Sequence, residues 1–134
     1  MTRVFVDTSA LLTLLDRADP RHEAARETFA GLADADLVTH GYVVAESLAV
    51  ARRRFGVDGA IALLDDMLPV VRLLPVEPEL HAGVQARYRA SLPSGVSFVD
   101  RVSFAVIERD QVDAAFTMDQ DFEVTGVPLI PSLG

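Results

Sequence analysis

This chain of 134 residues contains no cysteine. Without thiols it can form neither disulfides nor thiolate metal sites, so oxygen and imidazole nitrogen are the metal ligands that remain. A chain without disulfides is also typical of a reducing compartment, and we expect a cytoplasmic location.

Long apolar runs are missing as well. No stretch reaches the roughly 18 uninterrupted apolar residues that a membrane-spanning helix needs, so we expect no membrane association. Asp7 and Asp16 interrupt the apolar residues near the start, where no basic leader occurs, and we expect no signal peptide. Half of the residues are nevertheless apolar, enough for a real core. With no linker or repeat in view, residues 1–134 are predicted to form one domain.

Lysine is absent too, and the 12 basic residues are all arginines. The net charge of −8 argues against a nucleic-acid partner, because phosphate contacts need positive surface. Carboxylates that hold a metal ion would weaken this objection, and the planar guanidinium of arginine binds phosphate with two hydrogen bonds. Composition therefore leaves a nucleic-acid substrate open.

Apolar strands and amphipathic helices alternate along the chain. The predicted strands are Arg3–Asp7, Asp36–Thr39, Val70–Leu74, Asp113–Thr117 and Val127–Ile130. The predicted helices are Ser9–Leu15, Arg21–Leu32, Tyr42–Phe55, Val57–Leu68, Glu77–Leu92 and Phe98–Asp110, with Gly56 separating the third from the fourth. This alternation indicates βαβ units and a parallel sheet, and hence an α/β fold.

Two acidic residues follow predicted strands directly. Asp7 ends the first strand, and Asp119 comes shortly after the strand that ends at Thr117. A carboxylate at this place lies in the crevice at the carboxyl edge of a parallel sheet, where α/β folds bind ligands. The alternatives are local: Asp7 as a helix N-cap and Asp119 as part of a polar turn. Because Thr8 or Ser9 could cap the helix instead, we expect Asp7 to be free for function.

Two further acids lie on helices. At about 100° per residue, Glu46 points away from the apolar stripe of its helix, but its own side is also apolar, which predicts that it faces the crevice. The alternative is a solvated glutamate in a good helix-forming position. Asp100 shares a stripe with Ser103, Phe104 and Ile107, which places it at the rim of the core. Its alternative role is in a capping box that begins at Ser97.

Several carboxylates in one crevice repel one another and raise each other's pKa values unless a cation joins them. The sequence therefore suggests a divalent-metal site, and hard oxygen ligands suit Mg²⁺ or Mn²⁺. The candidate ligands are Asp7, Glu46, Asp100, Asp119 and, less favoured, Asp121. His22, His40 and His81 show no spacing typical of a metal or acid–base pair, and we expect His40, at a strand end, to be structural.

Four segments resemble one known family. They are Val4-Phe5-Val6-Asp7-Thr8-Ser9-Ala10-Leu11, Val43-Val44-Ala45-Glu46-Ser47, Ser97-Phe98-Val99-Asp100-Arg101 and Thr117-Met118-Asp119-Gln120-Asp121-Phe122. The chain is similar to PIN-domain ribonucleases and, more narrowly, to the VapC-type toxins of bacterial toxin–antitoxin pairs. One departure is the Arg-Val-Ser-Phe after Asp100, where relatives usually carry small or aliphatic residues, so substrate contacts are expected to differ.

The resemblance implies a three-layer α/β/α PIN-like domain around a central parallel sheet. It implies Mg²⁺- or Mn²⁺-dependent endonucleolytic cleavage of RNA that leaves 5′-phosphate and 3′-hydroxyl ends. The four family acids fall on Asp7, Glu46, Asp100 and Asp119, Asp121 matches a frequent additional acid, and Thr8, Ser9 and Thr117 match supporting polar positions. It also implies a cognate VapB-type antitoxin, a homodimer, and a heterotetramer or larger assembly with the antitoxin.

Other classes fit less well. Receiver domains and haloacid-dehalogenase-type phosphatases need a lysine near the phosphoryl group, and this chain has none. In an RNase H-like nuclease the first acid lies in an antiparallel hairpin, whereas here a helix is predicted to follow it. The serious alternative is a catalytically silent PIN-like module that binds RNA or a protein.

Overall fold

Residues 2–133 are described by the structure, a computed structural model. Its sheet has five parallel strands, in the order β3-β2-β1-β4-β5. They are β1 (Arg3–Val6), β2 (Asp36–His40), β3 (Arg72–Leu74), β4 (Ala114–Phe116) and β5 (Leu129–Ile130). Phe5 on the central strand pairs with Val38 on one side and Ala115 on the other. The predicted α/β class with a parallel sheet is confirmed.

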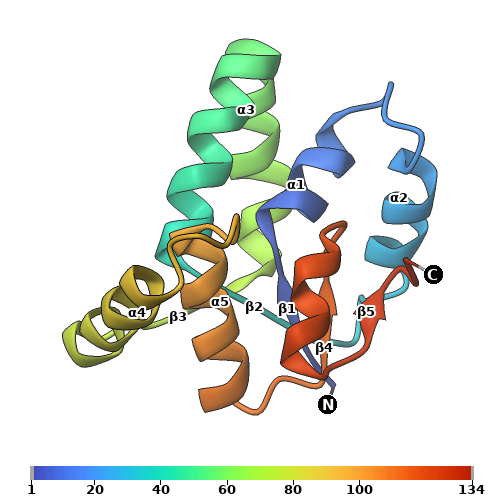
Figure 1. Ribbon diagram of the computed structural model, residues 1–134. Helices are drawn as coiled ribbons and strands as arrows, with labels where there is room; N and C mark the ends of the chain where they lie inside the picture. The colour runs from blue at the N-terminus through green and yellow to red at the C-terminus, as the bar shows by residue number, and fades with distance from the viewer. Residues whose placement is uncertain (1, 134) are drawn as a thin grey trace.

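Helices cover both faces of the sheet (Figure 1). Helices α1 (Thr8–Leu15), α2 (His22–Ala30) and α3 (Gly41–Ala62) belong to crossovers that lead from β1 through β2 to β3. Helices α4 (Pro78–Ala90) and α5 (Phe98–Arg109) and the 3₁₀ helix η3 (Gln120–Thr125) belong to crossovers in the opposite direction. Because crossovers are right-handed, the two groups lie on opposite faces, which gives three α/β/α layers.

The core is centred on β1. Val4, Phe5 and Val6 are at most 1% exposed, as expected for a parallel strand that is covered on both faces. Phe5 lies 6.2 Å from Phe122 of η3, ring centre to ring centre, which ties the β4–β5 connection to the central strand. This packing holds the carboxyl ends of β1 and β4 beside each other.

The predicted helix break at Gly56 is confirmed. Gly56 has φ +74° and ψ −163°, so α3 consists of two helical segments that meet at a kink at this residue. This backbone conformation is essentially confined to glycine. Beyond α3 the chain continues as a π turn, η1 (Leu63–Met67), and a 3₁₀ turn, η2 (Leu68–Val70), so the strand predicted from Val70 begins only at Arg72.

The remaining elements differ from prediction mainly at their ends, where fraying and capping decide the boundary. Among residues 2–133, no helix combines the length and the apolar character that crossing a bilayer requires.

Candidate metal centre

The acidic crevice lies where the direction of the sheet's crossovers reverses. β1 and β4 are neighbours, yet the chain leaves β1 toward one edge and β4 toward the other. In open α/β sheets this switch point leaves a crevice beyond the carboxyl ends of the two strands. Asp7 follows β1 directly and Asp119 follows β4 by three residues, so these two acids flank the crevice.

Asp7 is buried, with 3% of its surface exposed, and is held by two hydroxyls. Its Oδ2 accepts hydrogen bonds from Ser9 Oγ at 2.7 Å and from Thr117 Oγ1 at 3.0 Å. Each hydroxyl oxygen in turn accepts a backbone N–H, from Met118 at 2.8 Å and from Asp119 at 3.0 Å. Two hydroxyls, each positioned by a backbone N–H of the loop after β4, thus hold the Asp7 carboxylate in place.

Asp7 also caps α1, because its Oδ2 accepts the backbone N–H of Ser9 at 3.4 Å. The prediction that Thr8 or Ser9 would cap the helix was wrong. Ser9 is used against Asp7 and the β4 loop, and Thr8 Oγ1 is buried without a hydrogen-bond partner among the described residues. Burial outweighs the accepted hydrogen bonds and raises the pKa of Asp7 from 3.8 to about 6.

The position of Asp100 is set by the start of α5. Ser97 caps this helix, its Oγ accepting the backbone N–H of Asp100 at 3.1 Å. One turn on, Ser103 Oγ lies 2.9 Å from Nε2 of His40. His40 Nδ1 accepts backbone N–H groups at the start of α3, so Nε2 carries the proton and donates to Ser103. Burial lowers the pKa of His40 to about 4, and the expected structural role is confirmed.

Three carboxylates meet at one point. Asp100, Asp119 and Asp121 each offer an oxygen, and these oxygens lie within 4.8 Å of one another. Asp119 and Asp121 are held together by a hydrogen bond of 2.9 Å from the Asp121 N–H to Asp119 Oδ1, which also begins η3. Asp121, the less favoured of the two in the sequence, therefore belongs to the tightest group.

Asp7 and Glu46 lie outside this group of three but close enough to act on it. Burial, and then the charges of Asp7, Asp119 and Glu46 in that order of size, together raise the pKa of Asp100 from 3.8 to about 7. Glu46 is half-buried on α3 and is therefore not the solvated residue of the alternative reading. Acids that follow β1 and β4 or lie on α3 thus act electrostatically on Asp100 of α5.

This donor set suits a hard divalent cation. The group consists of three carboxylates, and Mg²⁺ and Mn²⁺ prefer such oxygen ligands. A carboxylate whose pKa is raised by burial and by neighbouring negative charges, as for Asp100, is one that a bound cation stabilises in its ionised form. Which carboxylates are ligands stays a prediction.

Comparison with known protein families identifies the domain. The PIN domain family matches residues 4–128. The chain belongs to the PIN domain family. This match covers every candidate acidic residue, and the resemblance seen in the sequence is confirmed.

Two relatives of this PIN domain, one of them with a solved structure, are informative. The 23S rRNA-specific endonuclease VapC20 of Mycobacterium tuberculosis is 31% identical over 124 residues, covering 92% of this chain and 94% of VapC20. Ribonuclease VapC26 of the same species is 30% identical over 121 residues, covering 87% of each chain. The crystal structure of VapC20, described as a Sarcin-Ricin loop cleaving toxin, matches with a TM-score of 0.80 and 29% identity over 92% of this chain and 95% of that one.

A more distant structure shares the fold alone. VapBC2 from Rickettsia felis, solved on a DNA fragment from its promoter, matches with a TM-score of 0.71 at 10% identity over 96% of this chain and 97% of that chain.

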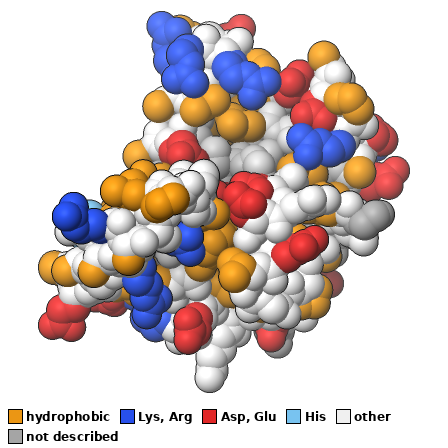
Figure 2. Space-filling view, viewed as in Figure 1, with side chains coloured by type: hydrophobic (Ala, Val, Ile, Leu, Met, Phe, Trp, Pro, Cys, Tyr) orange, Lys and Arg blue, Asp and Glu red, His pale blue; other side chains and the backbone are white. Residues whose placement is uncertain are grey.

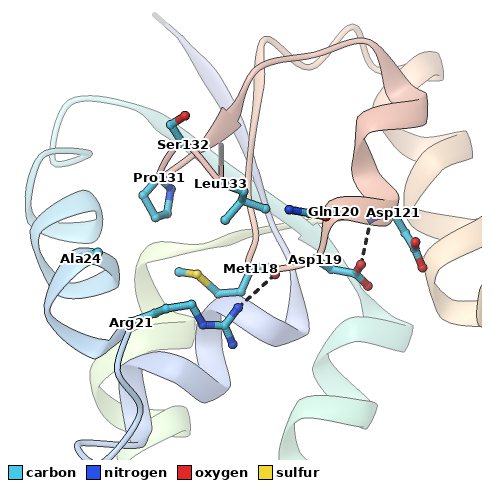
Figure 3. A pocket seen from close by; sticks show the side chains of 9 residues that line it. All are labelled: Arg21, Ala24, Met118, Asp119, Gln120, Asp121, Pro131, Ser132 and Leu133. Carbon is cyan, nitrogen blue, oxygen red and sulfur yellow. Dashed lines mark hydrogen bonds between the residues drawn. The ribbon is translucent and has the colours of Figure 1, made fainter.

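Beside the acids of this PIN domain lies a pocket of about 720 Å³ (Figure 3). Asp119, Gln120 and Asp121 line one side of it, and Arg21 of the α1–α2 loop lies on the other. Arg21 Nη1 donates to the carbonyl oxygen of Met118 at 3.2 Å, which fixes a guanidinium next to the acidic loop. No local pattern in the sequence links Arg21 to the strand end after β4, because the two meet only through tertiary packing.

We predict that Thr117→Val lowers catalytic activity by about 10- to 100-fold while the protein stays folded, because a supporting hydrogen bond to a metal-binding carboxylate is typically worth that much. Valine fills the volume of threonine but cannot donate to Asp7 Oδ2. Thr117→Ser keeps the hydroxyl and serves as the matched control. Rates of RNA cleavage, with thermal unfolding in parallel, check this; equal loss in both variants would contradict it.

Proposed function

We propose that this protein is a metal-dependent endoribonuclease and the toxin of a VapBC-type toxin–antitoxin pair. The observation that carries the proposal is the convergence of acids on Asp100, whose pKa is raised to about 7 by burial and by three neighbouring carboxylates. The full-length similarity to VapC20 and VapC26, both named as RNA-cleaving enzymes, supports the same reading.

Mg²⁺ or Mn²⁺ is the proposed cofactor. Asp100, Asp119 and Asp121 would hold it, with Asp7 as a further ligand from β1. A divalent ion in this place lowers the pKa of bound water and stabilises the charge that develops on a phosphate. Glu46 would complete the set, either toward a second ion or as the group that orients the attacking water.

The chain's own side chains have separable roles in this proposal. The hydroxyls of Ser9 and Thr117 orient Asp7, and the bond between His40 and Ser103 holds the first turn of α5 in place. Arg21, fixed against the Met118 carbonyl, would contact a phosphate of the RNA that lies next to the scissile one, with a charge-assisted hydrogen bond.

RNA is the proposed substrate class. VapC20 is named for cleavage of 23S rRNA and of the Sarcin-Ricin loop. For this chain we propose unpaired RNA in a loop, because proteins that read RNA bases do so mostly where the bases are unstacked.

An antitoxin and a second copy of the chain are the proposed protein partners. Val57, Ile61 and Leu64 are about half exposed, at 55%, 48% and 49%. Their spacing places them along one side of the end of α3 and of η1, and such apolar stripes on a surface indicate a protein contact. Leu63, in contrast, is buried, so the apolar residues of this segment serve both core and surface.

The deciding experiment is cleavage of a labelled RNA hairpin with Mg²⁺ or Mn²⁺, with EDTA and with the Asp119→Asn variant. We expect cleavage only by the wild type in the presence of metal, leaving 5′-phosphate ends. Cleavage that survives both EDTA and Asp119→Asn would refute the metal mechanism. Binding of the hairpin without any cleavage would favour the silent PIN-like module instead.

Metal affinity should fall in acid. A proton and a cation compete for Asp100, whose pKa is about 7 in the metal-free protein. With one proton displaced, the apparent Kd for Mn²⁺ rises about tenfold for each pH unit below that value. Titration calorimetry at pH 6 and pH 8 measures this. Asp100→Asn removes the proton and should flatten the dependence, whereas equal wild-type affinity at both pH values would contradict the prediction.

A further inference from the structure

A second pocket, of about 680 Å³, lies between α4 and the start of α5, apart from the acidic crevice. α4 and α5 pack side by side (Figure 1). The residues lining the pocket, defined here as the aromatic pocket, are His81, Gln85, Ala86, Tyr88, Arg89, Leu92 and Phe98. This combination of rings, an amide and a guanidinium is unlike the acid-lined pocket of the metal centre.

The rings form one continuous cluster. Phe98 lies 5.6 Å from Tyr88 and 5.4 Å from His81, in edge-to-face orientations, and 6.2 Å from Tyr42, nearly parallel. Tyr42 Oη lies 2.6 Å from Nδ1 of His81, which fixes both rings. The rings are therefore fixed relative to one another, as a stacking surface for a flat ligand requires.

The cluster reaches the metal centre through two short links. Tyr42 precedes Glu46 by four residues on α3, so the two side chains lie on the same side of the helix. Phe98 precedes Asp100 by two residues at the start of α5, where the two side chains point to opposite sides. The aromatic cluster and the acids therefore share the N-terminal parts of α3 and α5.

The charge of the pocket favours an anionic ligand. Its lining contains Arg89 but no aspartate or glutamate, although the chain as a whole carries a net charge of −8. Within residues 2–133, Arg89 takes part in no ion pair. The neighbouring pocket on the other side of α4 differs, because Glu79 and Glu108 accompany its arginines. Figure 2 shows arginine side chains on this flank of the molecule.

We propose that the aromatic pocket binds one unpaired nucleobase of the RNA substrate, next to the scissile phosphate but not at it. The base would stack against the Tyr88 ring, Gln85 would meet its hydrogen-bonding edge, and Arg89 would contact the adjoining phosphate. The proposal rests on the ribonuclease function given above, and it assigns a specificity subsite to α4. Single-strand binding proteins use the same combination of an aromatic stack and a positive groove.

Two pairs of variants test the subsite. Arg89→Gln removes the guanidinium of the pocket, and Arg87→Gln is its matched control, an exposed arginine in the same last turn of α4 that lines the other, acid-containing pocket. Tyr88→Leu removes the stacking ring but keeps apolar volume, and Tyr88→Phe keeps the ring. Circular dichroism and thermal unfolding establish that each variant is folded.

The measurement is the steady-state cleavage of a single-stranded oligoribonucleotide, and of copies that carry one abasic site at successive positions. We expect Arg89→Gln and Tyr88→Leu to raise KM about tenfold or more with kcat within about twofold, since one stacked base contributes that much. Arg87→Gln and Tyr88→Phe should stay near wild type. One abasic position, two or three nucleotides from the cut, should raise the wild-type KM and have no further effect in Tyr88→Leu.

The possible failures are distinguishable. If the wild type cleaves no RNA with Mg²⁺ or Mn²⁺, the proposed ribonuclease function fails. If the wild type cleaves and the two pocket variants keep its KM, the subsite is refuted. Variants that keep RNA kinetics but lose a protein partner would also overturn it and assign the pocket to that partner. A loss of kcat with unchanged KM would reject base binding in favour of an effect on α5.

Discussion

Asp100→Asn should lower RNA cleavage by about 10²–10³-fold or more and leave the fold intact. Asp100 is the acid on which the others act: Asp7, Asp119 and Glu46 all raise its pKa, and its carboxylate oxygen lies within 4.8 Å of those of Asp119 and Asp121. Asparagine has the shape of a protonated aspartate but cannot supply the negative charge that a divalent ion needs. Loss of preorganised electrostatic stabilisation in an active site has effects of this size.

The control for Asp100→Asn removes the same charge elsewhere. Asp65→Asn changes an exposed carboxylate in η1 that forms no ion pair among the described residues, and it should cleave at the wild-type rate. Initial rates at saturating Mn²⁺ and direct metal titration measure both variants. If Asp100→Asn retained more than a tenth of the activity with normal metal affinity, the cluster would not be the catalytic metal site.

Asp7→Asn should be inactive and yet more stable than the wild type in EDTA at pH 8. Burial raises the pKa of Asp7 from 3.8 to about 6, so keeping this side chain ionised costs the folded protein free energy. The rise corresponds to ~3 kcal/mol at most. Because Oδ2 accepts the known hydrogen bonds, an asparagine oxygen can replace it. The new NH₂ group lacks an assigned partner, which offsets part of this gain, so we expect a net gain of about 1–2 kcal/mol, or roughly 3–7 °C in Tm.

The stability difference between Asp7→Asn and the wild type should depend on pH. Below pH 3.8 Asp7 is protonated in both the folded and the unfolded chain, and its contribution to stability is fully present. Between 3.8 and about 6 the folded protein holds the proton more tightly, so the free energy of unfolding falls as the pH rises. Asp7→Asn removes this part of the decline, and the advantage of the variant should vanish near pH 3.

With bound metal, the wild type should be more stable than Asp7→Asn. Mg²⁺ binds the folded wild type and stabilises it by mass action, whereas Asp7→Asn has lost a proposed ligand and should respond less. Thermal unfolding at pH 8 and near pH 3, with EDTA and with Mg²⁺, tests both parts of the prediction. A variant that is less stable than the wild type in EDTA at pH 8 would show that the Asp7 carboxylate supports the fold rather than straining it.

Much of this arrangement could be predicted from local patterns. The alternation of apolar strands with amphipathic helices predicted the parallel sheet, and the residue after β1 was placed at its carboxyl edge. The helical repeat also predicted the side of α3 on which Glu46 lies. It placed Asp100 in the first turn of α5, at the rim of the core. These features were accessible because each depends on neighbours within one element.

Other features were not accessible, since they depend on contacts between distant segments. Asp7 caps α1 because Thr117, 110 residues away, helps to hold its carboxylate. Asp121 lies beside Asp100 because η3 begins with a turn at Asp119. The aromatic cluster forms because α3, α4 and α5 bring Tyr42, His81 and Phe98 into contact. Where several residues could cap a helix or bind a metal, tertiary packing selects among them, and a local sequence pattern does not describe that packing.

The amino-acid order by itself determined which residues are acidic, which follow buried strands, and that the chain is an α/β protein similar to PIN-domain ribonucleases. Tertiary structure alone decided which of these acids share one point in space and how far the pKa values of Asp7 and Asp100 rise. The physical reason is that charge repulsion and desolvation depend on separation and burial, and both quantities are fixed only when β1, α3, α5 and the loop after β4 pack together.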